Sequence, residues 1–351
     1  MTDSALPALI QHMLKPGFYP HPVSEPIRLM QTHVSYVLLT GEVVYKLKKP
    51  VDFGFLDYST LEKRRHFCQE ELRLNQRGAG SLYLSVEALT RAGDTFELDG
   101  DGEPVEYAVK MRQFPQSALL SDQFEKGLLN EDKIRHLATT IAEFHSKAAT
   151  SDHIRTYGTI SAIRQAIDEN YDQTVDFVSL GAETTIDKPQ TQKQFDETKV
   201  YTDEFFATRQ ALFQQRLDQD HIRACHGDLH LGNICDWEGN ILLFDCIEFN
   251  EPFRFVDTMY DVAYIVMDLE VAGRGDLAQI FLNQYVEETG DYEGLEILPL
   301  YVSRQSYVRA KVTSFMLGDP SVPMAERQAA SEKAAKYYCL AWSYVKKKKA
   351  R

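Results

Sequence analysis

The chain has 351 residues, of which 44% are hydrophobic and 26% charged, so it is long enough to form two lobes with separate cores. Its formal net charge of −14 argues against nucleic acid as the main partner, because phosphate backbones are bound by basic surfaces. No apolar run approaches the length of a membrane span, and the start lacks a basic segment followed by an apolar one. We therefore expect no membrane partner and a cytoplasmic location.

The cysteines favour a reducing compartment. There are five, an odd number at scattered positions, which favours free thiols over a disulfide framework. Three of them, Cys225, Cys235 and Cys246, lie near His226 and His230, so a zinc site is an alternative interpretation. The sequence has no C-x-x-C pair, and the apolar neighbours of these cysteines favour buried thiols instead.

Residues 1–31 are predicted to form an N-terminal arm with one short helix, because four prolines between residues 16 and 26 interrupt regular structure. Residues 32–39 and 43–47 then have the composition of two strands around a short turn. These strands begin a small lobe that we expect to span residues 32–112, and residues 113–351 are expected to form the larger lobe.

The second strand carries Lys46 and Lys48, whose side chains point to the same face because they are two residues apart. A helix is predicted to follow, with Ser59 or Thr60 as its N-cap. Glu70 lies on that helix, beside a second glutamate at position 71. Taken singly, strand lysines and helix glutamates are usually exposed to solvent.

Residues 82–90 and 105–111 are further predicted strands around an acidic turn. A helix is predicted over residues 131–149, with His145 on its apolar face. Later helices include one over residues 301–315 that carries two arginines, Arg304 and Arg309.

The stretch 225–250 carries the clearest chemical signal. Asp228 precedes Asn233 by five residues, the spacing of the kinase catalytic loop, where the Asp takes the acceptor's proton and the Asn holds a metal. The apolar run 241–244 predicts a strand that ends at Asp245. A lone Asp or Asn near a Gly is usually a turn residue. Together, however, Asp228, Asn233 and Asp245 are suited to hold hard cations beside a triphosphate.

The segments HGDLHLGNI, LLFDCIEFN and RFVDTMYDVAYIVMDLE resemble the aminoglycoside phosphotransferase and choline kinase superfamily, relatives of the protein kinases. The resemblance is strongest to a bacterial aminoglycoside-phosphotransferase-like branch that is sometimes fused to a P-loop ATPase domain. No G-x-x-x-x-G-K-[ST] motif occurs, so we expect no such domain in this chain. The resemblance implies an α+β, bilobal protein-kinase-like fold. It would have a small antiparallel sheet lobe with one helix and a larger, mainly helical lobe.

The resemblance also implies roles in the small lobe. Lys46, with Lys48 as the alternative, would hold the phosphates and pair with a glutamate of the following helix. Glu71 matches the kinase pattern better than Glu70, which stays the alternative. The backbone around Met111 and Gln113 would read the adenine edge of the nucleotide.

In the larger lobe, the resemblance implies that Asp228 is the catalytic base and that Asn233 and Asp245 bind Mg²⁺. Asp261 is expected to brace the catalytic loop, and His145 to be a packed structural histidine. The function implied is transfer of the γ-phosphoryl group of ATP to a hydroxyl of a small-molecule acceptor, with GTP as the alternative donor.

Three questions stay open in the sequence. A Ser/Thr protein kinase acting on a partner protein would use the same residues, and a non-catalytic nucleotide-binding module is a second alternative that the complete acidic and amide set disfavours. Glu248, three residues after Asp245, could contact a metal or the acceptor, although a turn residue is the simpler interpretation. The identity of the acceptor is not indicated.

Overall fold

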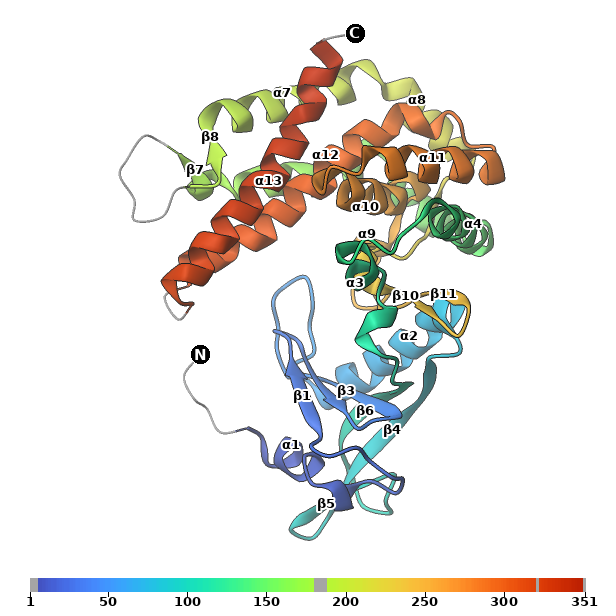
Figure 1. Cartoon of the computed structure of the whole chain (residues 1–351), viewed down its shortest axis with the longest axis vertical. Helices are drawn as coiled ribbons and strands as arrows, with labels where there is room; N and C mark the ends of the chain where they lie inside the picture. Colours follow the sequence, from blue (N-terminus) through green and yellow to red (C-terminus); the bar gives the residue numbers. More distant parts are fainter. Residues whose placement is uncertain (1–5, 180–187, 320–321, 350–351) are drawn as a thin grey trace. The chain divides into compact units, whose positions relative to one another are not determined.

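The structure, a computed structural model, describes residues 6–179, 188–319 and 322–349. The chain divides into two compact units (Figure 1). The first unit comprises Met1–Leu128 and Gly232–Phe253, and the second comprises Leu129–Leu231 and Arg254–Arg351. Compact packing units and kinase lobes are different divisions of a chain, so the lobe boundaries expected from the sequence remain a prediction.

The first unit is built on a six-stranded sheet with the order β1-β2-β3-β6-β4-β5, in which all neighbouring strands are antiparallel. The strands are β1 (Arg28–Gln31), β2 (Ser35–Leu39), β3 (Val43–Lys48), β4 (Tyr83–Ala92), β5 (Thr95–Leu98) and β6 (Pro104–Arg112). The predicted strand pair around residue 41 is therefore present as β2 and β3.

One long helix, α2 (Leu61–Ala79), packs against β4 and β6. Its N-cap is Thr60, whose side-chain oxygen accepts a hydrogen bond from the Lys63 N–H, as the sequence predicted. Near its end, a Cβ atom on Gly78 would lie 2.6 Å from the carbonyl oxygen of Leu243, so glycine allows α2 to approach that backbone closely.

The predicted N-terminal arm is more regular than expected. β1 pairs with β2 along the edge of the sheet, and α1 (Ala8–Met13) buries Ile10 and Met13 against sheet residues such as Tyr45. The four prolines between residues 16 and 26 lie between α1 and β1, where they interrupt neither element.

The hairpin of β10 (Ile234–Trp237) and β11 (Asn240–Leu243) belongs to the same unit. Its turn places Glu238 and Gly239 at positive φ, the geometry of a tight two-residue hairpin. The buried Cys235 of β10 joins a core cluster with Val109 of β6, which ties the hairpin to the sheet. The first unit also contains α3 (Leu120–Glu125).

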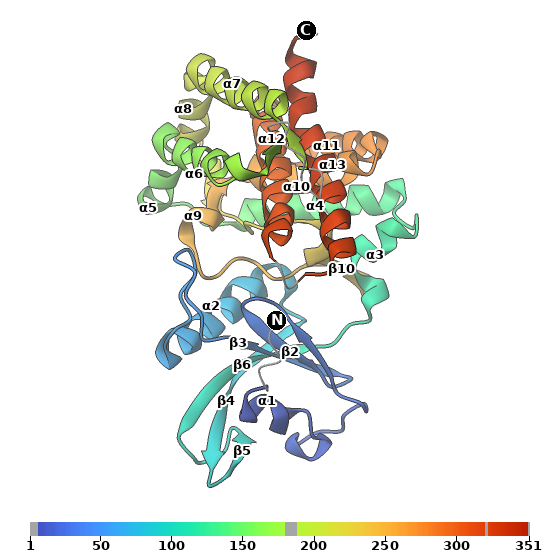
Figure 2. The ribbon, with the colours of Figure 1, turned by 90° about the vertical axis from the view of Figure 1, so that its left-hand side faces the viewer.

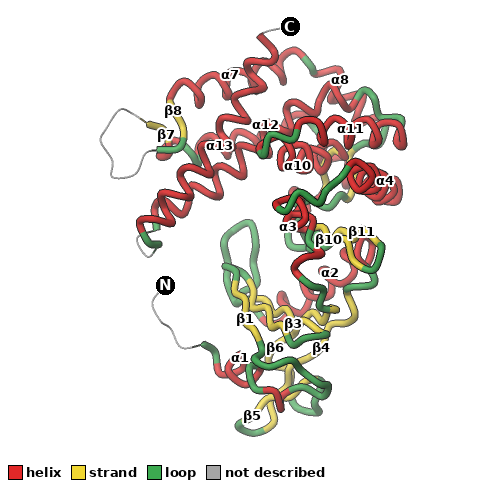
Figure 3. The backbone as a smooth tube through the Cα atoms, in the orientation of Figure 1, coloured by secondary structure: helices red, strands yellow, loops and turns green. Residues whose placement is uncertain are grey.

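The second unit is mainly helical, as the red segments of Figure 3 show. Its helices are α4 (Glu131–Lys147), α5 (Asp152–Arg155), α6 (Ile160–Asp172), α7 (Gln192–Thr208), α8 (Gln210–Asp218), α10 (Thr258–Val271), α11 (Gly275–Thr289), α12 (Gly294–Ser314) and α13 (Met324–Lys349). Short strands pair as β9 (Ile222–Ala224) with β12 (Phe255–Asp257) and as β7 (Val178–Ser179) with β8 (Gln190–Thr191). The four-residue helix α9 (Glu251–Arg254) spans the point where the chain passes from the first unit to the second.

Helix α10 lies in the core of the second unit, where α11, α12 and α13 pack against it (Figure 2). Helix α4 packs against α11 through the face predicted from its sequence, which includes the buried His145. In the described ranges, no helix is both long enough and apolar enough to cross a membrane.

Candidate active site

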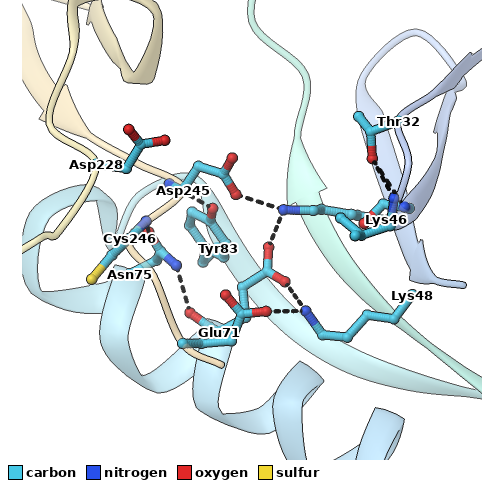
Figure 4. Close-up of polar contacts among 12 residues, drawn as sticks. Thr32, Lys46, Lys48, Glu71, Asn75, Tyr83, Asp228, Asp245 and Cys246 are labelled. Carbon is cyan, nitrogen blue, oxygen red and sulfur yellow. Dashed lines mark hydrogen bonds and ion pairs between the residues drawn. The ribbon is translucent and has the colours of Figure 1, made fainter. Parts of the chain in front are cut away.

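Lys46 joins two of the residues that the sequence singled out. Its ammonium group donates to Glu71 Oε1 at 2.8 Å and to Asp245 Oδ1 at 2.5 Å (Figure 4). The three side chains come from β3, from α2 and from the residue that follows the strand β11 by two positions. The fold of the first unit thus brings Lys46, Glu71 and Asp245 together, although Lys46 and Asp245 are 199 positions apart in the sequence.

A second lysine extends this cluster. The Lys48 ammonium lies 2.6 Å from Glu71 Oε2 and also donates to Glu248 Oε1, which accepts a further hydrogen bond from the Tyr58 hydroxyl at 2.5 Å. Each oxygen of Glu71 therefore accepts from one lysine. Sequence reasoning kept Lys48 only as an alternative to Lys46 and read Glu248 as a turn residue, whereas the structure buries both in one network.

The structure also separates the two adjacent glutamates of α2. Glu71 is fully buried and pairs with Lys46 and Lys48, whereas Glu70 pairs with Arg73 on the same helix. The two residues differ by about 100° around the helix axis, so only one of them can face the sheet. Glu71 is the partner that the family resemblance implied.

The charges in the network hold one another ionised. Burial opposes the charged form of Lys46, but the carboxylates of Asp245 and Glu71 outweigh it and raise its pKa well above the usual range. Burial likewise opposes the charge on Lys48, and Glu248 and Glu71 nevertheless raise its pKa. For Glu71, burial favours the neutral acid, but the two lysines lower its pKa overall.

Asp245 is held by its backbone as well as by Lys46. Its φ is +62°, and its N–H donates to the Tyr83 hydroxyl at 3.1 Å. The next N–H, that of Cys246, donates to Asn75 Oδ1 at 2.8 Å. Aspartate tolerates this left-handed conformation better than most residues, and the two bonds fix it. The Asp245 side chain remains 44% exposed, so its carboxylate is accessible.

The residues present suit a divalent cation. Two lysines face three carboxylates, those of Glu71, Asp245 and Glu248, so the network carries one excess negative charge. Asn233 begins the same hairpin, and its carbonyl oxygen accepts from the N–H of Phe244, the residue before Asp245. Carboxylate and amide oxygens at one end of the hairpin are the ligand types that Mg²⁺ takes.

The two residues expected near the adenine lie at the end of β6. Gln113 Oε1 accepts from the Gly41 N–H at 3.0 Å, and the Gln113 N–H donates to the Glu42 carbonyl at 2.8 Å. Gln113 therefore holds the turn between β2 and β3 in place. The sequence did not indicate these contacts. Met111 pairs with Val44 in the sheet and packs against a core cluster. Their role toward a nucleotide stays a prediction.

In the second unit, Asp261 braces the loop that carries Asp228. Its carboxylate accepts from the N–H groups of His226 and Gly227 at 2.7 and 2.9 Å and contacts His145 Nε2 at 3.2 Å. Gly227 has a φ of +89°, a conformation that favours glycine. The bracing expected of Asp261 and the structural place of His145 are confirmed.

Sequence reasoning missed a second brace. The carboxylate of Asp268, two turns further along α10, accepts from the Leu231 N–H at 2.9 Å. Its position seven residues after Asp261 puts both acids on one face of the helix, which is the signal that the sequence offered. Burial raises the pKa of Asp268.

Asp228 itself lies between these braces. Its carboxylate is 3.5 Å from His230 Nε2, and its side chain is 39% exposed. Burial favours the neutral acid, but His230 and Arg309 outweigh it and lower the pKa. An ionised carboxylate with partial access to solvent can accept a proton from a hydroxyl group.

The cysteines considered as zinc ligands are buried. The sulfur of Cys225 forms a group with His145 and Asp261, with ligand atoms within 4.8 Å of one another, and not with Cys235 and Cys246, which belong to the other unit. Asp261 already accepts from two backbone N–H groups and contacts His145. The role of Asp261 in bracing the loop of Asp228 therefore accounts for the proximity of these three side chains without a metal ion.

Lys311 on α12 is expected to make the stability of the protein depend on pH. Burial and the nearby Arg304 lower its pKa to about 8 from the ordinary 10.5, so the unfolded chain binds more protons between these two values. The contribution of Lys311 to the free energy of unfolding should therefore rise with pH across that window. Urea unfolding of the wild type and Lys311→Met at several pH values should show this rise only in the wild type. A pH-independent difference between the two proteins would contradict it.

Comparison with known structures shows the fold. A choline/ethanolamine kinase family protein from Mesorhizobium loti has a TM-score of 0.53 at 11% identity, over 97% of this chain and 98% of that one. Choline kinase from Cryptosporidium parvum has the same TM-score at 10% identity, over 97% of this chain and 94% of that one. The expected α+β kinase-like fold is confirmed.

The sequence comparisons match part of the chain to a known family. Residues 131–298 match APH, described as the Phosphotransferase enzyme family, which confirms the superfamily that the motifs resemble. The uncharacterized protein Rv2004c of Mycobacterium tuberculosis is 32% identical over 304 residues, covering 86% of this chain and 58% of that protein. The uncharacterized protein Mb2027c of Mycobacterium bovis matches to the same extent. The chain thus spans 58% of the length of these curated relatives.

Proposed function

We propose that the protein transfers the γ-phosphoryl group of ATP to a hydroxyl group of a small-molecule acceptor, with the assistance of Mg²⁺. The observation that carries this proposal is the bridging of Glu71 and Asp245 by Lys46, because it unites the phosphate-binding lysine, its helix partner and the metal-binding aspartate of a kinase. The match of residues 131–298 to the Phosphotransferase enzyme family supports it independently. ATP as donor and buried free thiols both suit the cytoplasm.

Each residue then has a distinct task. Lys46 binds the phosphate oxygens of the nucleotide, and Lys48 keeps Glu71 ionised and in place when Lys46 turns to the phosphates. Asn233 and Asp245 would hold Mg²⁺. When bound, the metal neutralises charge on the phosphates and orients them. Asp228 accepts the proton of the acceptor hydroxyl, so that the oxygen can attack the γ-phosphorus of ATP while the bond from that phosphorus to the bridging oxygen breaks and ADP leaves. Most of the acceleration comes from positioning and charge neutralisation.

Two other functions use parts of this site. A protein kinase would need the same residues, and it is distinguished by phosphate incorporation into proteins of a lysate. A nucleotide-binding module without transfer activity would not need an ionised, accessible carboxylate at position 228. The low pKa and partial exposure of Asp228 therefore argue against this alternative.

The binding site for the nucleotide can be tested without knowledge of the acceptor. Calorimetric titration of ATP should show binding that is strengthened by Mg²⁺ in the wild type, and the Asp245→Ala variant should lose the Mg²⁺ dependence, because its metal ligand is gone. Glu103→Ala removes an exposed carboxylate of the same unit and should bind as the wild type does. If neither ATP nor GTP binds to the wild type, the proposed function is wrong.

A further inference from the structure

One ion pair of the candidate site joins two groups to which the proposed function gives different ligands. The Lys46 ammonium, which would bind the phosphates, donates at 2.5 Å to Oδ1 of Asp245, which would bind Mg²⁺ (Figure 4). An ammonium group and a divalent cation on one carboxylate repel each other, and so do a phosphate and a carboxylate on one ammonium group. The contact between Lys46 and Asp245 therefore opposes the binding of either ligand by itself.

Lys46 can exchange its partners without leaving a buried charge unpaired. Glu71 accepts from Lys46 on one oxygen and from Lys48 on the other, at 2.8 and 2.6 Å. Lys48 also pairs with the buried Glu248, and the Lys48 side chain is 1% exposed, against 16% for Lys46. Because Glu71 keeps Lys48, movement of Lys46 avoids the large cost of breaking a buried ion pair completely. The second lysine thus makes Lys46 the exchangeable member of the network.

Asp245 should keep its position when Lys46 leaves it. The Asp245 N–H donates to the Tyr83 hydroxyl at 3.1 Å, and the N–H of Cys246 donates to Asn75 Oδ1 at 2.8 Å. Neither contact involves Lys46. The Asp245 side chain is already 44% exposed, so its carboxylate would be held in place and accessible to a cation.

The balance of charge favours an exchange in which both ligands take part. Two lysines and three carboxylates give the network one excess negative charge, which attracts a cation but repels a triphosphate. Asp245 can exchange Lys46 for a divalent cation while Lys46 exchanges Asp245 for a phosphate oxygen, so that both end with a partner of opposite charge. With only one ligand present, either Lys46 or Asp245 faces a like charge.

We propose that the ion pair between Lys46 and Asp245 weakens the binding of a divalent cation alone and of a nucleotide alone, so that the two ligands bind with positive coupling. This coupling belongs to the protein and adds to the direct attraction of the cation for the phosphates. The inference rests on the proposed function and describes how the nucleotide site of that function is regulated.

The binding of Mn²⁺ without nucleotide tests this inference. Mn²⁺ suits the same oxygen ligands as Mg²⁺, and the electron paramagnetic resonance signal of the free ion falls as the ion binds. Lys46→Met should bind Mn²⁺ about tenfold more tightly than the wild type, because Asp245 loses a charged hydrogen-bond partner that competes with the ion. An unchanged or weaker affinity would overturn the inference.

Two further variants show where a gain in Mn²⁺ affinity arises. Lys126→Met removes the same charge from the first unit and likewise takes a lysine from an aspartate, because Lys126 pairs with Asp122 at 2.7 Å. It should bind Mn²⁺ as the wild type does. In the double variant Lys46→Met/Asp245→Ala the gain should disappear. An equal gain in Lys126→Met, or a gain that persists in the double variant, would place the effect elsewhere and overturn the inference.

The reciprocal measurement uses ATP in the presence of EDTA, which removes divalent cations. Asp245→Asn should bind metal-free ATP more tightly than the wild type, because Lys46 is released and a repelling charge is lost, whereas Asp122→Asn should not. Thermal unfolding checks that each variant folds. Absence of this gain overturns the inference even if Mg²⁺ and ATP together bind to the wild type. Failure of the wild type to bind them together overturns the proposed function instead.

Discussion

Replacement of Lys48 by methionine should lower the free energy of unfolding of the first unit by about 3–5 kcal/mol, the usual cost of removing one partner of a buried ion pair. The Lys48 side chain is 1% exposed, and its loss would leave Glu248 without its lysine in an environment that excludes water. Glu71 would keep only Lys46. The cost arises less from the attraction that is lost than from the buried charge that remains.

Lys46→Met is the matched control. Lys46 lies on the same strand and contacts the same Glu71, but Lys48 would still hold that carboxylate and Asp245 is 44% exposed to water. We expect a loss of about 1 kcal/mol or less, close to that of an exposed pair.

The two units need separate probes, because a chain with two cores need not unfold in one step. Trp237 lies in the hairpin of the first unit and Trp342 in α13 of the second. In a Trp342→Phe background, urea unfolding followed by tryptophan fluorescence therefore reports on the first unit alone. Equal losses in the free energy of unfolding for Lys46→Met and Lys48→Met would show that Lys48 contributes no more to stability than Lys46 does.

Asp228→Asn should reduce kcat for phosphotransfer by about 10²–10⁴-fold, the range for loss of a general base, and should leave nucleotide affinity nearly unchanged. The amide has the shape of the carboxylate but cannot accept the proton of the acceptor hydroxyl. Asp228 also belongs to a loop that is braced separately by Asp261 and Asp268, so the substitution should not disturb the loop.

Kinetics with a saturating acceptor, together with ATP calorimetry, measure the two quantities separately. The contrast is Asp245→Ala, for which Mg²⁺-dependent nucleotide binding should fall. If Asp228→Asn lost nucleotide affinity and turnover to the same degree, the role of general base would be wrong, and Asp228 would act in nucleotide binding instead.

Features with a local physical cause could be read from the sequence. Thr60 caps α2 because its hydroxyl satisfies an N–H at the start of that helix, and the apolar spacing around His145 fixes which side of α4 is buried. The five-residue spacing from Asp228 to Asn233, and the strand that ends before Asp245, identified the central motif before any contact was known. Each of these signals depends on residues a few positions apart.

What the tertiary structure decided depends on residues far apart. Lys48 and Glu248 are separated by 200 positions, and no periodicity in either segment shows that Glu71 takes one lysine on each oxygen. Likewise, the contact of Arg304 with the Tyr260 ring exists only because α12 packs beside α10. A buried charge is stable only where the fold supplies its partners, so the sequence determined which charged residues are present and their packing decided which of them are paired.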